Sequence, residues 1–472
     1  MKKGLLVVFL MALALVPLFA QNDAKSEGLQ IGDTTWKFNG EIRFMYTDQT
    51  DPGYYSFGVP DKDISLSEPD SFNRMYQRYR FGVTGSMGDR ISAHFELQVG
   101  DEQWGNKNYN EREMNIRTLY AYLQFRPEFL GDNTSFRVGL QGYDDIFQYS
   151  IWSDEGVGIM LNHTTDNFTA NVGYLTLRDD DVDTELLDFK SKGILVEDMG
   201  VVPFPASETL FIADMNYKAT DVLNLKGAFY YDTIRDSIVI MGPGMSFTYS
   251  MAYYGAGADY KLNDMLTFGG HFVMRSGNMK MWAADDLLSD VDINGWFAYA
   301  YSTFTMDKFS AKINFGYTPW SLNEDSFTGW GGAFPLMDGA YITTASFFGG
   351  NQWQTAYGLE YFGRGEVCDR QAVNGGYGGM YGLMVISANL SYDFLFANFG
   401  ILRNTDSTDF DDYITPPASL GTELDLGVKT EIMKGLEFKA VYAMFFAGDF
   451  YAYDGEDAEN GHEMSMLLRY TF

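Results

Sequence analysis

Charged side chains recur at alternate positions along stretches whose intervening residues are aromatic or aliphatic. Arg78 and Arg80 alternate with aromatic residues, and Glu41 and Arg43 alternate with apolar ones. Alternate residues of an extended strand share a face, so these charges would lie on one wet face. Arginines that face carboxylates across a narrow aqueous opening create a field that orders water and selects solutes by polarity. The pattern therefore predicts the selection of solutes by charge and polarity rather than catalysis.

The sequence gives little sign of catalysis. Its histidines are His94, His163, His271 and His462, and His94 lies two residues before Glu96 on one strand face. That spacing is open to metal binding or acid–base chemistry, but we favour two polar side chains on a wet face. The motifs of zinc proteases, serine hydrolases, phosphate-binding loops and paired redox cysteines do not occur. We therefore predict no enzyme activity, no cofactor and no metal centre.

Strands with period-two alternation must position these charges. The last of them, Glu463 to Phe472, has one apolar face and ends on an aromatic residue. That ending is typical of the closing strand of a membrane β-barrel, although an edge strand of a soluble sandwich is the alternative for this stretch alone. So many strands with one continuous apolar face favour a barrel with a water-filled interior. The clearest are 36–46, 78–84, 91–99, 223–232, 309–317, 422–429, 436–444 and 463–472.

Short and long polar segments alternate along the chain, which is the layout of outer-membrane barrels, with the short turns in the periplasm. Short turns are expected near 87–90, 127–133, 164–167, 218–221, 262–264, 307–308, 393–395 and 433–435. Longer segments are expected near 48–73, 101–113, 142–156, 178–207, 233–249, 276–293, 319–380, 404–419 and 447–462.

We predict an all-β fold, a transmembrane antiparallel β-barrel of about 18 strands within a range of 16–18, with both termini in the periplasm. The weakest strands are 157–163, which is short, and 296–305, where both faces are aromatic or small. Segment 319–380 is interpreted as a long loop or lid, or as hiding a further hairpin around 349–351.

The N-terminus has the pattern of a secretory signal peptide. Lys2 and Lys3 precede an apolar run, and Ala20 precedes the polar Gln21. We expect cleavage after Ala20, so that 1–20 is the signal peptide and 21–472 forms the barrel. No later stretch approaches the roughly 20 apolar residues of a membrane helix.

Composition agrees with an exported barrel. Aromatic residues make up 17% of the chain, which suits two interfacial girdles, and the single cysteine allows no intrachain disulfide. The formal net charge of −31 argues against nucleic acid as a partner. Acidic loops suggest weak divalent-cation binding, including bridges to lipopolysaccharide phosphates, although solvated loops explain the charge more simply. Segment 179–183 begins like a calcium loop but has Thr184 and Lys190 where glycine and glutamate are required.

The sequence resembles the general porins, particularly the trimeric porins of anaerobic Gram-negative bacteria such as sulfate reducers. The resemblance rests on Arg78-Tyr79-Arg80-Phe81, on Thr118–Phe125 and on Val138–Gln141, and the strand rhythm and Phe472 extend it over the mature chain. It implies an outer-membrane homotrimer that passes small hydrophilic solutes and ions, and a third loop folded inward as a constriction.

Residues are assigned to the pore on this basis. In 142–156, the apolar residues would anchor the loop to the inner wall, while its acids face the arginines; these apolar residues are Ile146, Phe147, Ile151 and Trp152. The alternative is an extracellular loop with solvated acids, in which case the wall arginines only pair with lumen carboxylates such as Glu41 and Glu96. Arg117 shares a face with Leu119 and Ala121, so we place it at the rim. The predicted pore-lining residues are Arg43, Arg78, Arg80, Arg137, Glu41, Glu96 and His94, and the predicted constriction-loop acids are Asp144, Asp145, Asp154 and Glu155.

The leading functional hypothesis is passive diffusion of small hydrophilic solutes and ions through an outer-membrane porin. The alternative is a substrate-selective channel for an anionic solute or saccharide, with arginines as a track. An outer-membrane enzyme or adhesin is a third and weaker reading. A plugged, energised transporter is disfavoured because only 21–34 precede the first strand, too few for a plug domain.

Overall fold

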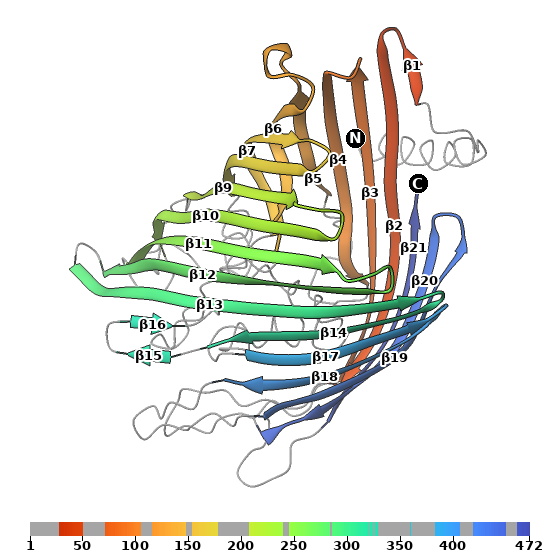
Figure 1. The fold of residues 1–472 in the computed structure, drawn as a ribbon, viewed down its shortest axis with the longest axis vertical. Coiled ribbons are helices and arrows are strands. Elements are labelled where there is room, and N and C mark those ends of the chain that lie inside the picture. The colour runs from red at the N-terminus through yellow and green to blue at the C-terminus, as the bar shows by residue number, and fades with distance from the viewer. Residues whose placement is uncertain are drawn as a thin grey trace, which may run out of the picture.

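The computed structural model shows a single continuous antiparallel sheet that closes into a barrel (Figure 1). It describes residues 28–50, 71–104, 116–147, 153–177, 207–238, 245–283, 286–319, 321–323, 326–328, 359, 383–405, 419–449 and 460–472. The signal-peptide prediction for 1–20 and the calcium-loop segment 179–183 therefore lie outside the described residues.

The described elements are strands and one 3₁₀ helix, η1. In the first half of the chain they are β1 Leu29–Ile31, β2 Thr34–Thr50, β3 Ser71–Met87, β4 Ile91–Trp104, β5 Ile116–Phe125, η1 Glu128–Leu130, β6 Thr134–Asp144, β7 Ser153–Thr164, β8 Phe168–Leu177, β9 Ser207–Lys218 and β10 Leu223–Ile238. In the second half they are β11 Met245–Lys261, β12 Leu266–Ala283, β13 Asp286–Met306, β14 Phe309–Thr318, β15 Ser321–Asn323, β16 Ser326–Thr328, β17 Leu383–Tyr392, β18 Leu395–Asn404, β19 Ser419–Met433, β20 Leu436–Ala447 and β21 Gly461–Thr471.

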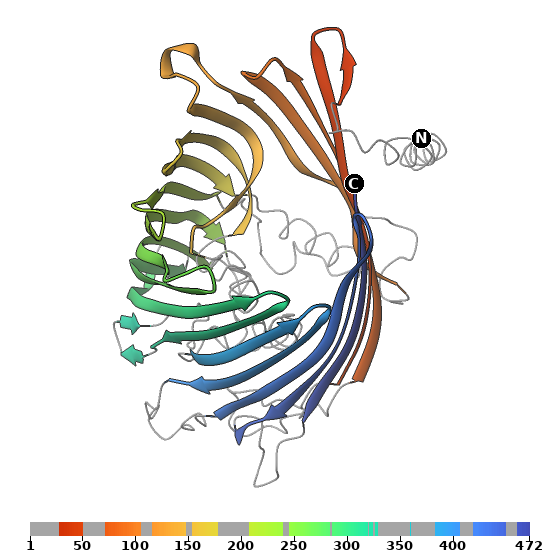
Figure 2. The same ribbon diagram turned by 45° about the vertical axis from the view of Figure 1, so that its right-hand side comes forward.

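The barrel wall contains 18 strands, which confirms the predicted number. Each of these strands pairs with the next strand of the ring, β14 pairing with β17. Strand β21 closes the ring by pairing with β2 from Glu41 opposite Thr471 to Thr50 opposite His462. The short strands β1, β15 and β16 stand outside this ring, because β1 folds back on β2 and the β15–β16 hairpin attaches to β13. Strands β2–β4 and β19–β21 form one wall, which faces β9–β14 across the interior (Figure 2).

The two faces of the wall differ sharply in chemistry. Along β21, Met464 and Met466 are about two-fifths exposed, whereas Glu463 and Ser465, which alternate with them, are almost completely buried. The same alternation exposes Phe44 in β2 and Phe81 in β3 on the outside. An apolar outer face with polar side chains turned inward is the inverse of a soluble sandwich, and it is the arrangement that a lipid-embedded barrel requires.

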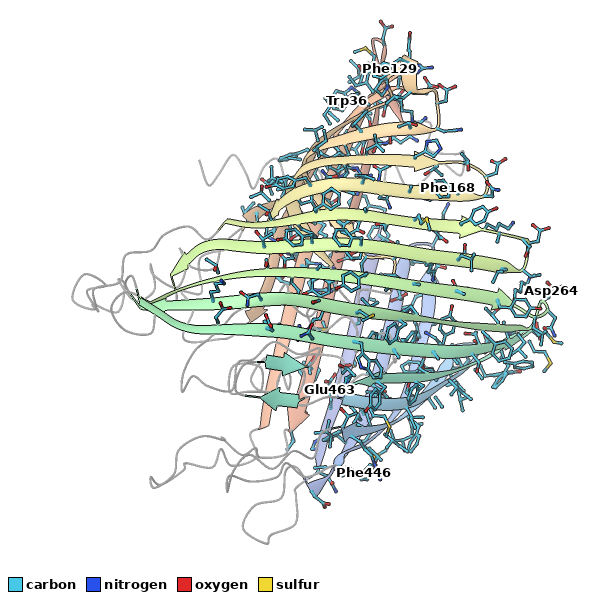
Figure 3. All side chains as sticks on the ribbon, turned by 60° about the vertical axis from the view of Figure 1, so that its left-hand side comes forward. Trp36, Phe129, Phe168, Asp264, Phe446 and Glu463 are labelled. Atoms are coloured by element: carbon cyan, nitrogen blue, oxygen red, sulfur yellow. The ribbon has the colours of Figure 1, made fainter. Side chains whose placement is uncertain are left out.

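All the short turns predicted from the sequence join consecutive strands at one rim. One of the two-residue turns is Asp307–Lys308, where Asp307 adopts a φ of 51°, a left-handed conformation that aspartate tolerates in hairpins. In the β11–β12 turn Lys261 Nζ lies 2.7 Å from Asp264 Oδ1, and this hydrogen bond lowers the pKa of the Asp264 carboxyl. Trp36, Phe129, Phe168 and Asp264 mark this rim in Figure 3, and Phe446 and Glu463 lie toward the other.

The long segments predicted at 276–293 and 233–249 are much shorter in the structure. The segment predicted at 276–293 consists mostly of strand, because β12 continues to Ala283 and β13 begins at Asp286. Likewise, β10 continues to Ile238 and β11 begins at Met245, within the segment predicted at 233–249. Both predictions failed because polar residues on these strands resemble loop sequence, while the ladder hydrogen bonds to neighbouring strands keep the backbone extended.

Candidate pore constriction

The predicted arginine wall lies on the interior face of β2, β3 and β4. Arg78 donates to Glu41 Oε1 through Nε at 2.9 Å and Nη2 at 2.6 Å, and both side chains are mostly buried. Arg80, opposite Glu41 in the ladder, donates through Nε to Gln98 Oε1 at 2.7 Å. Arg43 lies opposite Arg78 in the same ladder. The structure thus brings these predicted residues together on three adjacent strands.

His94 and Glu96 belong to the same wall, on β4. His94 Nε2 lies 3.4 Å from Glu96 Oε2, and His94 Nδ1 lies 2.8 Å from the Thr84 hydroxyl on β3. The imidazole also packs 5.1 Å from the Tyr122 ring on β5. The pair is therefore held by neighbouring strands, as expected for polar side chains of the inner face.

Arg137 extends the polar wall onto β6. Its guanidinium carbon lies 4.7 Å from the centre of the Tyr122 ring, a cation–π contact, and its Nη2 lies 3.4 Å from Gln124 Oε1. Both partners belong to β5. Arg137 thus continues the row of cations from β2 and β3 toward the base of the third long connection.

The face predicted for Arg117, shared with Leu119 and Ala121, is wrong. A β-bulge in the β4–β5 ladder, between Glu96 and Leu97, shifts the register, so Arg117 lies opposite Gln98 on the interior face. Its Nη2 lies 3.8 Å from Glu155 Oε1 on β7. Strict alternation would put Arg117 on the same face as Leu119. The extra residue of the bulge reverses the face of the β5 residues on its far side, including Arg117.

The bounds predicted for the constriction loop are too wide. Strand β6 ends at Asp144 and β7 begins at Ser153, so the connection is 145–152 rather than 142–156. Of the predicted acids only Asp145 lies in this connection. Asp144 ends β6, while Asp154 and Glu155 belong to β7, opposite Tyr143 and Gly142. These polar residues resemble loop sequence but are paired in a ladder.

The C-terminal part of β6 pairs with β7 but not with β5. Strand β5 pairs with β6 only from Phe125 opposite Phe136 to Ala121 opposite Leu140. Strand β7 continues to pair with β6 as far as Asp144. We call residues 141–147 the arm, because β5 no longer pairs with this part of the chain.

The arm reaches distant strands of the inner wall. The Tyr143 hydroxyl donates to the Asp214 carboxylate on β9 and lies 3.0 Å from the Tyr230 hydroxyl on β10. Phe147 is completely buried, and its ring lies 5.3 Å from the His271 ring on β12. Its backbone N–H donates to Asp145 Oδ1 at 2.6 Å. The wall contact of Phe147 agrees with the anchoring expected of this loop's apolar residues.

Two matching rows of polar side chains cross the inner wall, and sequence reasoning missed both. In the first, Asn162 donates to Asn171 and Asn171 donates to Asp214, at 2.6 and 2.8 Å, across β7, β8 and β9. In the second, across β17, β18 and β19, Asn389 donates to Asn398 at 3.3 Å and Asn398 donates to Asp425 at 3.0 Å. The signal was present: each row contains two asparagines nine residues apart, in the shared pattern Asn-x₃-Asp-x₃-Ala-Asn-x-Gly-x-Leu, starting at Asn162 and at Asn389.

One described residue of the long segment 319–380 also lies at the inner wall. Leu359 is buried, and a Cβ at Gly400 of β18 would lie 2.6 Å from its Cδ1. At its start, the segment forms the β15–β16 hairpin, which attaches to β13 without adding to the ring. The hairpin proposed around 349–351 lies outside the described residues.

Neither a membrane helix nor a metal-binding cluster occurs in the described part of the chain. No described helix is long and apolar enough to cross a membrane. No group of three or more His, Cys, Asp or Glu side chains among the described residues has the arrangement of a metal site.

Comparison with known proteins shows that the chain shares its fold with solved structures. No protein-family model matches the chain. No curated protein matches it. Pseudomonas aeruginosa OccD3 (OpdP) shares 12% identity over 94% of this chain and 92% of its own, with a TM-score of 0.51. A double variant of OccD1 (OprD) shares 13% identity over 95% and 97%, with a TM-score of 0.50. The outer membrane protein OprD from P. aeruginosa shares 12% identity over 93% of each chain, with a TM-score of 0.48. The first two likenesses establish the shared barrel fold.

Proposed function

We propose that this protein is an outer-membrane porin, a water-filled channel for passive diffusion of small hydrophilic solutes and ions. The observation that carries the proposal is the closed 18-strand ring with apolar side chains outside and charged side chains inside. Closed barrels with an apolar outer band are the strand-built structures that span membranes, and barrels of this size leave room for an aqueous lumen. The structural neighbours of the chain share this architecture.

Within this proposal the predicted charged residues line the pore. Arg43, Arg78, Arg80 and Arg137, with Glu41, Glu96 and His94, lie on the interior faces of β2, β3, β4 and β6. The arm narrows the lumen beside them. Asp144 and Asp145 belong to the arm, and Asp154 and Glu155 lie on β7 opposite it. Opposed fixed charges in a narrow passage would produce weak ion selectivity.

Conductance of the purified protein in a planar lipid bilayer tests the proposal. We expect stepwise openings that pass ions of both signs. Replacing Arg78 and Arg80 by glutamine should shift the reversal potential in a salt gradient toward cation preference. Arg90→Gln is the matched control, because Arg90 lies in a short turn and pairs with Asp132 at 2.7 Å. A folded protein without conductance would refute the channel function.

A specific arrangement favours the second candidate, a channel selective for an anionic solute. Arg43 has Arg78 as its ladder partner on one side and Arg469 on the other. Three arginines thus stand in lateral register across β3, β2 and β21. Competition separates the candidates, because a bound organic anion would block current at low concentration, whereas a saccharide of similar size would not.

Finer properties follow from the sequence resemblance. We infer a homotrimer of the type found in anaerobic Gram-negative bacteria, embedded beside lipopolysaccharide, with no cofactor and no enzymatic activity. Weak divalent-cation binding by acidic loops belongs to the same inference. Mass measurement of the detergent complex tests the trimer, and calcium titration by calorimetry tests the loops.

A further inference from the structure

We propose that Gly255 is a positioning residue that holds the constriction by admitting the ring of Phe147. The inference rests on the proposed channel function. It concerns which contact holds the constriction in place, rather than which charges line it. Three observations carry it: the distance that the arm spans, the absence of a side chain at Gly255, and the loss of β5 pairing at the base of the arm.

The end of the arm contacts strands that are far from its base in the ring. Strands β6 and β11 are five places apart in the ring, which at ~4.8 Å per strand is about 24 Å along the wall. Phe147 nevertheless lies against β11 and β12, on the interior face that carries His271. The outer face of these strands carries Tyr254 and Phe272, both about two-fifths exposed. The end of the arm, at Phe147, therefore lies in the interior.

Gly255 leaves the space that the phenyl ring occupies. A Cβ at Gly255 would lie 2.5 Å from Phe147 Cε2 and 2.6 Å from Cζ. It would also lie 3.0 Å from Val273 Cγ2 on β12, its ladder neighbour. Two sides of the site are therefore occupied, and any larger residue at 255 must expel the ring.

The arm needs this contact because one edge of its base is unsupported by the ladder. Beyond Ala121 and Leu140 the β5–β6 pairing ends. The arm is then held by β7, by the Tyr143–Asp214 hydrogen bond and by Phe147. The Asp145 carboxylate binds the Phe147 N–H, which fixes the backbone where the ring enters its site.

Displacement of the ring would release the end of the arm. Phe147 would lose a fully buried environment, and the acidic residues near it would lose their fixed positions. We therefore expect a wider and less selective passage, with several open levels in place of one.

Single-channel recording with matched variants tests the proposal. Gly255→Val fills the site, and Phe147→Ala removes its occupant. Ala256→Val is the control, because Ala256 is the next residue on β11 and is exposed on the outer face. Folding is checked by the difference in electrophoretic mobility between heated and unheated protein. We expect higher conductance and reduced ion selectivity for Gly255→Val and Phe147→Ala, and wild-type behaviour for Ala256→Val.

The double variant Phe147→Ala/Gly255→Val decides whether the two residues act through one contact. Its conductance should equal that of Phe147→Ala, because no ring remains to be displaced. Additive changes, or a Gly255→Val channel that matches wild type, would overturn the proposal while leaving the channel function intact. If Gly255→Val does not fold, Phe147→Leu and Phe147→Ala decide: a graded rise in conductance supports the anchor, and unchanged conductance refutes it. A silent wild-type protein would instead refute the channel function itself.

Discussion

The Tyr143 hydroxyl on β6 donates a hydrogen bond to the buried Asp214 carboxylate on β9, three strands away around the barrel. Asp214 also accepts from Asn171 on β8, and Tyr230 on β10 lies within hydrogen-bond distance of Tyr143. One carboxylate thus connects the arm to β9 of the inner wall. This contact and the Phe147–Gly255 contact hold the arm at two separate points.

Tyr143→Phe should destabilise the folded barrel by about 1–3 kcal/mol, because a buried carboxylate loses a hydrogen-bond donor. Equilibrium unfolding in urea from lipid vesicles, followed by tryptophan fluorescence, measures the change. Tyr174→Phe is the control, since Tyr174 is half-exposed on the outer face. Equal stabilities for both variants would show that the Asp214 contact contributes nothing.

Asn171→Leu and Asn398→Leu should each cost about 1–3 kcal/mol, because each removes one amide donor from a buried aspartate. The two rows lie on well-separated parts of the ring. The double variant should therefore show the sum of the two single effects within about 0.5 kcal/mol. A marked departure from additivity in the same unfolding experiment would contradict independent rows.

Arg117→Cys should react with a charged, membrane-impermeant thiol reagent, because the bulge turns this position toward the interior. Ile116→Cys, on the neighbouring outward position, should be protected by lipid. Both variants require a Cys368→Ser background, since Cys368 is the natural thiol. Mass spectrometry of the labelled protein in vesicles gives the result. The opposite labelling pattern would show that Arg117 faces the lipid, as strict alternation with Leu119 implies.

Deletion of Phe472 should reduce the yield of folded barrel. Its backbone forms two hydrogen bonds with Gly40, at 3.0 and 3.2 Å, each contributing about 1 kcal/mol at the closing seam. Its ring also lies where a Cβ at Gly40 would be, and it stacks 5.8 Å from the Tyr470 ring. Phe472→Ala separates the side chain from the backbone: it should assemble better than the deletion and worse than wild type. Normal assembly of the deletion, measured by heat-modifiable mobility, would count against this role.

The local pattern of the sequence was enough to predict the barrel and its turns. Period-two alternation is a property of neighbouring residues, so the strands around Arg78, His94 and Met464 could be located without any tertiary information. Turn residues such as Asp307 and Asp393 act on their own backbone, and both have positive φ as turns of this kind require. The even strand number and the pairing of β21 with β2 follow from these local features.

Tertiary structure decided everything that depends on residues far apart in the chain. The bulge that turns Arg117 inward depends on the register between β4 and β5, which no single strand specifies. Asp154 and Glu155 have the composition of a loop, but they are in a strand because β6 pairs with them. The place where Phe147 packs depends on Gly255, more than a hundred residues away, because the missing side chain there leaves the space that the phenyl ring occupies.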